Sequence, residues 1–172
     1  MRDLAERVNL RASSLYSHIR RKEEILQKIC AEQDRRFTEA MDEVEHMECK
    51  PVEKVRILLS LHIRTALEDP TSVTVFSDEW KHLEEPYLQK FSERRRIYEQ
   101  RFLNIIEEGI KGGAFKPLDA NIILYTLLTA IRWLHHKQQT QPALSGEKQE
   151  QQIIELLMGG LENNLPKEGG ER

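Results

Sequence analysis

The sequence is poor in cysteine, glycine and proline, and it has no long apolar run. Two cysteines, Cys30 and Cys49, form neither a disulfide framework nor a metal-binding quartet, which favours a reducing compartment. Residues 1–30 lack the apolar stretch of a signal peptide. No segment approaches the roughly 18 apolar residues that a membrane-spanning helix needs. We therefore expect a cytoplasmic protein with no membrane association.

Motifs that carry catalysis or metal binding are missing too. The 6 histidines show neither an HExxH pair nor a Cys/His spacing suited to zinc. The chain also has no GxSxG elbow, no P-loop and no GxGxxG loop. The sequence therefore predicts no enzyme, no metal site and no cofactor.

The chain consists mainly of residues that favour helices. Only 8 Gly and 6 Pro interrupt a composition that is 39% hydrophobic and 32% charged. Apolar residues recur at helical spacing between the prolines, and no alternating strand pattern is visible. Gly112 or Gly113 should end one helix, and the LDAN stretch should cap the next. The sequence predicts an all-α fold with a linking helix at about 22–46 and further helices at 51–68, 86–111, 118–137 and 147–165.

Charge is distributed unevenly along the chain. Residues 1–30 hold seven Lys or Arg and four Asp or Glu, a net charge of +3, and the remaining residues carry a net charge of −6. A basic head on an acidic body indicates that a polyanion would bind the head alone. The length of 172 residues suits one domain, or a small module followed by a larger one.

The basic head has the pattern of a helix-turn-helix. A short helix at about 1–8 is followed by a turn at Asn9, a second short helix at about 12–18 and a new helix from Lys22. In such a motif the second helix enters the major groove, and flanking basic residues contact phosphates. An ordinary helical hairpin with a solvated polar face fits the same pattern equally well. The DNA contacts that the motif predicts are Arg11, Ser13, Ser14, Tyr16, Ser17, His18, Arg20 and Lys22.

A family resemblance favours the helix-turn-helix. The segments RDLAERVNL (2–10), SSLYSHI (13–19) and RRKEEIL (20–26) resemble the DNA-binding signature of TetR-family transcriptional repressors. Arg11 stands where that family has a capping Ser or Thr. The family's first helix has no counterpart here, and we expect it to precede Met1 rather than to have been lost.

The resemblance implies that the last two helices of the body form a homodimer. Both helices are more apolar than the outer helices of a monomer, and Gly159 and Gly160 permit close helix approach. A dimer would place two recognition helices in successive turns of the major groove, so the implied operator is palindromic. The residues expected at the dimer interface are Ile131, Leu134, Ile154, Leu157 and Leu161.

In TetR-family repressors the central helices enclose a small-molecule pocket. Polar residues on apolar faces, namely His62, Arg95 and Tyr125, are the best candidates for ligand contacts, because buried polar groups need partners. Residues 79–134 resemble the subgroup that senses fatty acyl-CoA, which implies a small, apolar, acyl-bearing ligand. The full set of expected ligand contacts is Leu59, His62, Phe76, Trp80, Tyr87, Phe91, Arg95, Tyr98, Phe102 and Tyr125.

The sequence therefore predicts a dimeric repressor that a small apolar ligand releases from double-stranded operator DNA. The expected domains are a helix-turn-helix at 1–28, a regulatory domain at 29–165 and a disordered tail at 166–172. The alternative is an all-α ligand carrier or interaction protein whose incomplete head does not bind DNA.

Overall fold

The structure, a computed structural model, describes residues 12–137 and 146–163, and both ranges are mainly helical. Within them no strand occurs, and a single isolated bridge pairs Phe115 with Glu162. The prediction of an all-α fold is confirmed. No described helix is both long and apolar enough to cross a bilayer. The elements are α2 (Ala12–His46), α3 (Pro51–Glu68), α4 (Pro70–Thr74), the π-helical turn η1 (Val75–Glu79), the 3-10 turn η2 (Trp80–His82), α5 (Tyr87–Lys111), α6 (Ala120–Lys137) and α7 (Gly146–Leu161).

Most helix ends lie where the proline, glycine and capping signals predict them. Pro51 and Pro70 are the first residues of α3 and α4, where a missing N–H costs nothing. Gly113, two residues after the end of α5, adopts a φ of 72°, a conformation that favours glycine. Asp119 caps α6, because its Oδ1 accepts hydrogen bonds from the backbone N–H groups of the next turn, at 2.8 and 3.1 Å.

The last helix is shorter than expected. The sequence predicts a helix to residue 165, whereas α7 ends at Leu161. The backbone turns there because it pairs with the loop that follows α5. The Lys116 N–H donates to the Leu161 carbonyl at 3.0 Å, and the Asn163 N–H donates to the Ala114 carbonyl at 2.9 Å. The predicted tail at 166–172 lies outside the described residues.

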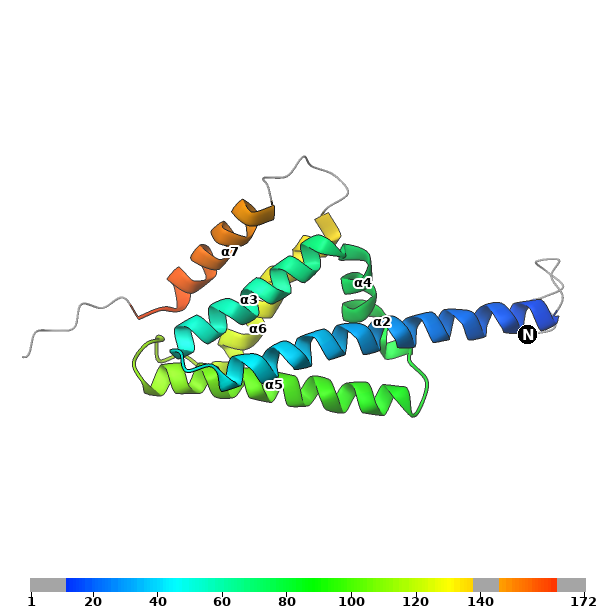
Figure 1. The fold of residues 1–172 in the computed structure, drawn as a ribbon, viewed down its shortest axis with the longest axis horizontal. Coiled ribbons are helices and arrows are strands. Elements are labelled where there is room, and N and C mark those ends of the chain that lie inside the picture. The colour runs from blue at the N-terminus through cyan, green and yellow to red at the C-terminus, as the bar shows by residue number, and fades with distance from the viewer. Residues whose placement is uncertain (1–11, 138–145, 164–172) are drawn as a thin grey trace, which may run out of the picture.

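The first described helix corrects a second prediction. The sequence predicts one helix at about 12–18 and another from Lys22, but α2 runs without a break from Ala12 to His46. Neither Gly nor Pro occurs anywhere in this span. Arg20 and Glu24 also form an i,i+4 ion pair across the expected boundary, at 3.3 Å. The N-terminal part of α2 extends well beyond the body of the molecule (Figure 1).

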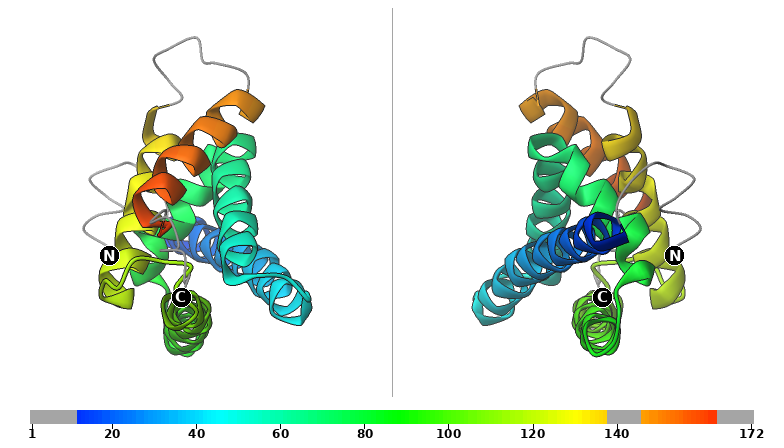
Figure 2. Two further views of the ribbon diagram at one scale, coloured as in Figure 1. Left: turned by 90° about the vertical axis from the view of Figure 1, so that its left-hand side faces the viewer. Right: turned by 90° about the vertical axis from the view of Figure 1, so that its right-hand side faces the viewer.

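The five longer helices surround one main core and one smaller apolar cluster. Helices α2 and α5 run side by side, α3 and α6 cross them, and α7 packs on α3 (Figures 1 and 2). The main core takes fully buried side chains from all of these elements, including Met41, Val44, Val55, Leu58, Leu59, Ile63, Phe102, Ile106, Phe115, Leu124 and Met158. The smaller cluster joins α2, η1, η2 and α5 and consists of Cys30, Leu83 and Phe91 packed against Leu26, Phe76, Trp80 and Leu88.

Candidate functional site

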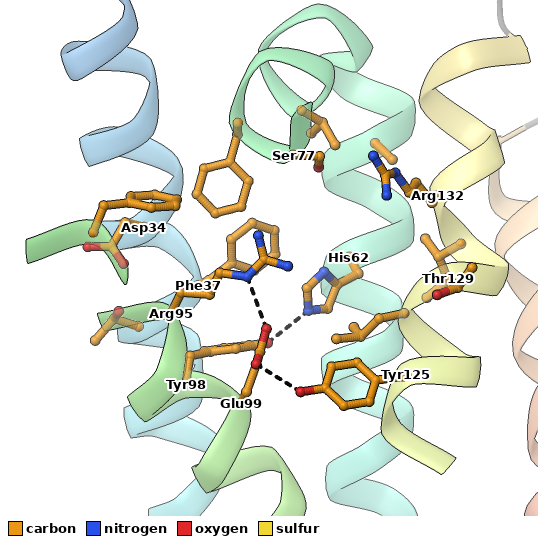
Figure 3. Close-up of a pocket in the computed structure, with 17 residues that line it drawn as sticks. Asp34, Phe37, His62, Ser77, Arg95, Tyr98, Glu99, Tyr125, Thr129 and Arg132 are labelled. Carbon is orange, nitrogen blue, oxygen red and sulfur yellow. Dashed lines mark hydrogen bonds and ion pairs between the residues drawn. The ribbon is translucent and has the colours of Figure 1, made fainter. Parts of the chain in front are cut away.

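A cavity of about 200 Å³ opens where the main core meets the smaller cluster. Its walls come from α2, α3, α4, η1, α5 and α6, and Figure 3 shows the lining side chains converging from these elements. The lining residues are Asp34, Phe37, Thr38, His62, Ala66, Val73, Phe76, Ser77, Phe91, Arg95, Tyr98, Glu99, Tyr125, Leu128, Thr129, Ile131 and Arg132.

Phe37 on α2 is the centre of the aromatic lining. Its ring stacks on His62, with the ring centroids 4.4 Å apart, and on Phe76, with the centroids 5.6 Å apart. Tyr98 meets the same ring edge-on at 6.0 Å, and Phe91 meets Phe76 edge-on at 5.4 Å. The ring cluster thus joins α2, α3, η1 and α5 around the cavity.

His62 and Tyr98 form a polar pair inside this aromatic lining. The His62 Nε2 and the Tyr98 hydroxyl lie 2.9 Å apart (Figure 3). Burial lowers the pKa of His62 to about 4, because an imidazolium would lose its hydration there. Burial likewise raises the pKa of Tyr98 well above its usual value. Both side chains are therefore uncharged at neutral pH.

Charged side chains gather at the more exposed edge of the cavity. Arg95 donates from Nε to Glu99 at 3.0 Å, and the Tyr125 hydroxyl donates to the same carboxylate at 3.3 Å (Figure 3). Arg132 on α6 forms an ion pair with Asp78 in η1. The side chains of Arg95 and Arg132 are 45% and 55% exposed, so these charges stay in contact with water. We refer to Arg95, Glu99, Tyr125 and Arg132 as the mouth of the cavity.

Ion pairs fasten α2 to the rest of the body beside the cavity. Arg94 on α5 donates to Asp34 at 2.7 Å, and Asp34 is itself nearly buried in the cavity wall. Arg101 on α5 contacts Asp42 at 2.6 Å and Glu45 at 2.5 Å. Pairs with one partner in contact with water contribute little stability each, but they fix the direction of a helix that is already packed through its apolar face.

No metal site is found in the described ranges, and burial shields the thiol of Cys30. Residues 12–137 and 146–163 contain no group of three His, Cys, Asp or Glu side chains that could hold a metal ion. Burial, together with the nearby charge of Asp34, raises the pKa of Cys30 to about 11. That thiol therefore stays protonated at neutral pH.

Several residues predicted as ligand contacts do come together around the cavity, and the others do not. Leu59 and Phe102 are fully buried in the main core, Tyr87 is exposed at the start of α5, and Trp80 stands behind Phe91, with the Arg95 guanidinium over its ring. The residues of this set that the structure places in the cavity lining are His62, Phe76, Phe91, Arg95, Tyr98 and Tyr125, and their contact with a ligand stays a prediction.

The sequence interpretation missed the contribution of α2. Phe37 is the only aromatic side chain among residues 20–50, and its position on the apolar face beside Met41 and Val44 is a signal that could have been used. Asp34 and Glu99 were also missed. They lie four residues or fewer from apolar positions that face the core, and nothing local distinguishes them from solvated acids.

The residues predicted to contact DNA lie at the projecting end of α2. Arg11 falls outside the described residues, whereas Ser13, Ser14, Tyr16, Ser17 and His18 belong to the first turns of the helix. Arg20 and Lys22 follow on the next turns, and both are exposed.

The residues predicted for the dimer interface require a correction. Ile131, Leu134 and Leu161 are at most 5% exposed, and they belong to the core of the single subunit. Their helices turn that face toward α3 and α5, so these three side chains are not on a surface that a second copy could contact. Ile154 and Leu157 are half-buried against the same core. Besides Tyr125 at the mouth of the cavity, the large apolar side chains that α6 and α7 do expose are Ile122, Trp133 and Leu156.

The family model and the curated relative that match this chain agree with each other. The family model described as "Tetracyclin repressor-like, C-terminal domain" matches residues 48–161. The HTH-type transcriptional repressor KstR2 of Mycolicibacterium smegmatis is 23% identical over 167 residues, which cover 94% of this chain and 80% of that protein.

Solved structures resemble the chain over nearly its whole length. The ketosteroid transcriptional regulator KstR2 of Mycobacterium tuberculosis gives a TM-score of 0.76 at 19% identity and covers 95% of this chain and 84% of its own. AibR in complex with isovaleryl coenzyme A and operator DNA gives a TM-score of 0.70 at 19% identity and covers 91% and 85%. At these identities the likeness of the structures shows the fold.

Proposed function

Because the chain belongs to the tetracycline-repressor-like (TetR) family of transcriptional regulators, we propose that it is a dimeric repressor that a small apolar ligand releases from a palindromic operator. Its relatives are regulators and not enzymes, and the cavity described above is the proposed ligand site. The same premise makes the cytoplasm the expected compartment.

In this proposal the segment that recognises DNA, which we call the reading head, is the projecting N-terminal end of α2. Ser13, Ser14, Ser17 and His18 would contact base edges, and Tyr16 would hold a phosphate together with Arg11, Arg20 and Lys22. The exposure of Arg20 and Lys22, on a part of α2 that reaches beyond the body, supports this role (Figure 1). Phosphate contacts of this kind make the affinity fall with salt.

The proposed dimer uses the apolar side chains that α6 and α7 expose. Leu156 is 77% exposed and Ile122 is 65% exposed, and leaving side chains of this size in water is unfavourable. Gly159 and Gly160 leave open space beside Leu156, which would allow a second helix to approach closely. Two copies joined in this way would present two α2 ends to one face of a duplex.

The proposed ligand is an acyl thioester whose acyl part enters the cavity. Phe37, Phe76 and Phe91 in the lining suit an apolar group, and Arg95 and Arg132 at the mouth suit the phosphates of a coenzyme A moiety that stays outside. The AibR structure, solved with isovaleryl coenzyme A and operator DNA, gives this proposal a precedent in the same fold.

The observation that carries the proposal is that one helix, α2, takes part in both the predicted DNA contacts and the cavity wall. Helix α2 holds the residues predicted to contact DNA, and the same helix contributes Asp34, Phe37 and Thr38 to the cavity wall. A ligand that prefers one position of Phe37 would therefore tilt the reading head, whereas a ligand with equal affinity for both positions would shift nothing. A coupling of about 1–3 kcal/mol would suffice for a working switch.

The test uses the purified protein. Selection from a random duplex library should return a palindrome, and isovaleryl coenzyme A should lower the affinity for it by roughly 5–150-fold in fluorescence anisotropy. Tyr16→Ala and Lys22→Ala should weaken binding to all duplexes alike. Ser14→Ala and His18→Ala should change the preferred base pairs, by roughly 1–3 kcal/mol per lost contact. Failure to select any sequence would contradict the proposal.

A further inference from the structure

The uncharged and the charged polar groups of the cavity lie in different places. The uncharged pair, His62 and Tyr98, is enclosed among aromatic rings, whereas Arg95 and Arg132 stand at the mouth and remain exposed. We propose that the buried part of the ligand is a compact apolar group bearing one uncharged oxygen, a carbonyl or a hydroxyl, which hydrogen-bonds to the His62–Tyr98 pair. Any ionised part of the ligand stays at the mouth. This inference rests on the proposed ligand-binding function of the cavity.

The pair has hydrogen-bonding capacity left after its internal bond. A neutral imidazole offers one donor and one acceptor, and a phenol offers one donor and two acceptor sites. When the Tyr98 hydroxyl donates to His62 Nε2, the Tyr98 oxygen still accepts from a ligand hydroxyl. When the other tautomer of His62 donates from Nε2, the Tyr98 hydroxyl is left to donate to a ligand carbonyl. The pair therefore serves either group without becoming charged.

An ionised group is excluded from the same place. A carboxylate beside the pair would lose its hydration without gaining a cation, because His62 is neutral there. The two carboxylates that border the cavity, Asp34 and Glu99, would repel it as well. The guanidinium groups that face these carboxylates, Arg94 and Arg95, already donate to them. A carboxylic acid would therefore bind with its charged end outward or would not bind.

The size of the cavity limits the buried group. Its volume of about 200 Å³ is only slightly larger than that of an engineered cavity of about 150 Å³ that binds benzene. The buried part of the ligand thus has on the order of six to ten non-hydrogen atoms, as in a short branched acyl chain or a single ring. A fused steroid nucleus exceeds this volume. The cavity therefore points to a smaller ligand than the ketosteroids after which the KstR2 regulator of Mycobacterium tuberculosis is named.

Three aromatic probes of similar size test whether the buried part of the ligand needs an uncharged oxygen and excludes a charge. Acetophenone carries a carbonyl, ethylbenzene carries no oxygen, and benzoate carries a charge. Calorimetric titration of the full chain without DNA should rank acetophenone about tenfold tighter than ethylbenzene, with benzoate weakest. Tyr98→Phe should remove the preference for acetophenone. Tyr87→Phe, which deletes a hydroxyl exposed at the start of α5 and outside the cavity lining, should keep it.

The ranking in the unmodified protein tests the inference even if Tyr98→Phe fails to fold. Equal affinity for acetophenone and ethylbenzene would overturn it, as would tight binding of benzoate, tighter binding of a steroid ketone, or no binding of any probe. Because the titration contains no DNA, it is independent of the repressor role. A chain that shows the expected ranking but selects no duplex would contradict the proposed function and leave the ligand class supported.

Discussion

The main core and the cavity end of the subunit are built from the same helices but filled differently. In the core, Phe102, Phe115 and Met158 are fully buried among other apolar side chains. Phe115 packs so closely on α5 that a Cβ atom at Gly109 would lie 2.2 Å from its ring. At the cavity end the helices leave about 200 Å³ between them, and the side chains that face this space include His62 and Tyr98.

The backbone differs between the two ends as well. The helices around the main core are regular, whereas the cavity wall includes the π-helical turn Val75–Glu79, which supplies Phe76 and Ser77. Such turns often mark functional sites, because they re-aim side chains at a cost in regular hydrogen bonding. Close packing stabilises the main core, whereas the cavity end is packed less closely and leaves a space of the size that a small ligand needs.

Truncating one phenylalanine at each end should separate the two regions most clearly. Phe102→Ala leaves a cavity in the closed core and should lower the free energy of unfolding by about 3–5 kcal/mol. Phe76→Ala should cost less than half as much, because its ring already borders empty space. Urea unfolding measures both values. Equal losses would show that the cavity end is packed as tightly as the core.

Acid should destabilise the cavity end through His62. Its pKa of about 4 lies below the ordinary value of 6.5, so the unfolded chain binds more protons between these two pH values. Stability is therefore complete above pH 6.5 and falls as the pH drops toward 4. From pH 7 to pH 5 the unmodified protein should lose about 2 kcal/mol more than His62→Gln does, in urea unfolding at each pH. Parallel pH profiles would mean that His62 is protonated as easily in the folded protein as in the unfolded chain.

Acid should have a smaller effect on the contact of α7 with α3, where the folded protein favours the charged form of a side chain instead of the neutral form. Burial alone would raise the pKa of Glu150, but hydrogen bonds from Arg64 at 2.7 Å and Ser60 at 2.5 Å outweigh it and lower that pKa below 4.5. This stabilisation is present above pH 4.5 and is lost as the pH falls through the lowered pKa. Glu150→Gln should cost about 1 kcal/mol at pH 7 in urea unfolding.

Glu155→Gln is the matched control on the same helix, because Glu155 is exposed and no ion pair involves it among the described residues. It should leave stability unchanged at pH 7. A loss at Glu155 as large as that at Glu150 would show that the charge of α7, rather than the contact with α3, stabilises the helix.

The smallest effect on folding is expected on the exposed face of α7. Leu156→Ser should change the free energy of unfolding by less than about 0.5 kcal/mol in a monomer, because the side chain is almost fully exposed. It should nevertheless weaken the proposed dimer in sedimentation equilibrium. Leu161→Ser, five residues further along, replaces a core side chain and should unfold the protein instead. A dimer unchanged by Leu156→Ser would remove this face from the proposal.

Local signals in the sequence predicted most of the fold. The prolines at 51 and 70, the positive φ of Gly113 and the capping carboxylate of Asp119 each act within a few residues, so their effect can be read without knowing the neighbours. The continuity of α2 could not be read in this way. The family pattern indicated a break, and the absence of Gly and Pro from the helix is weaker evidence than a breaker would be.

The site was predicted only in part, because it depends on contacts between distant segments. Leu156, Leu157 and Leu161 are equally apolar in the sequence, and only packing against α3 decides which of them stays outside. Phe37 is separated from His62 by 25 positions along the chain, and Asp78 from Arg132 by 54. His62, by contrast, stood out because a polar side chain on an apolar face requires a partner, and the structure gives it Tyr98 as that partner.

We expect ligand to bind at the cavity end and not on the exposed face of α6. The two tryptophans report on these places, since Trp80 packs on Phe91 beside the cavity and Trp133 is exposed on α6. Fluorine NMR of the protein labelled with 5-fluorotryptophan, assigned with Trp→Phe variants, would follow both during a titration with acetophenone. We predict a saturable shift of the Trp80 resonance that Tyr98→Phe weakens, with a smaller change at Trp133. An unchanged Trp80 resonance at saturation, or a shift confined to Trp133, would contradict the account.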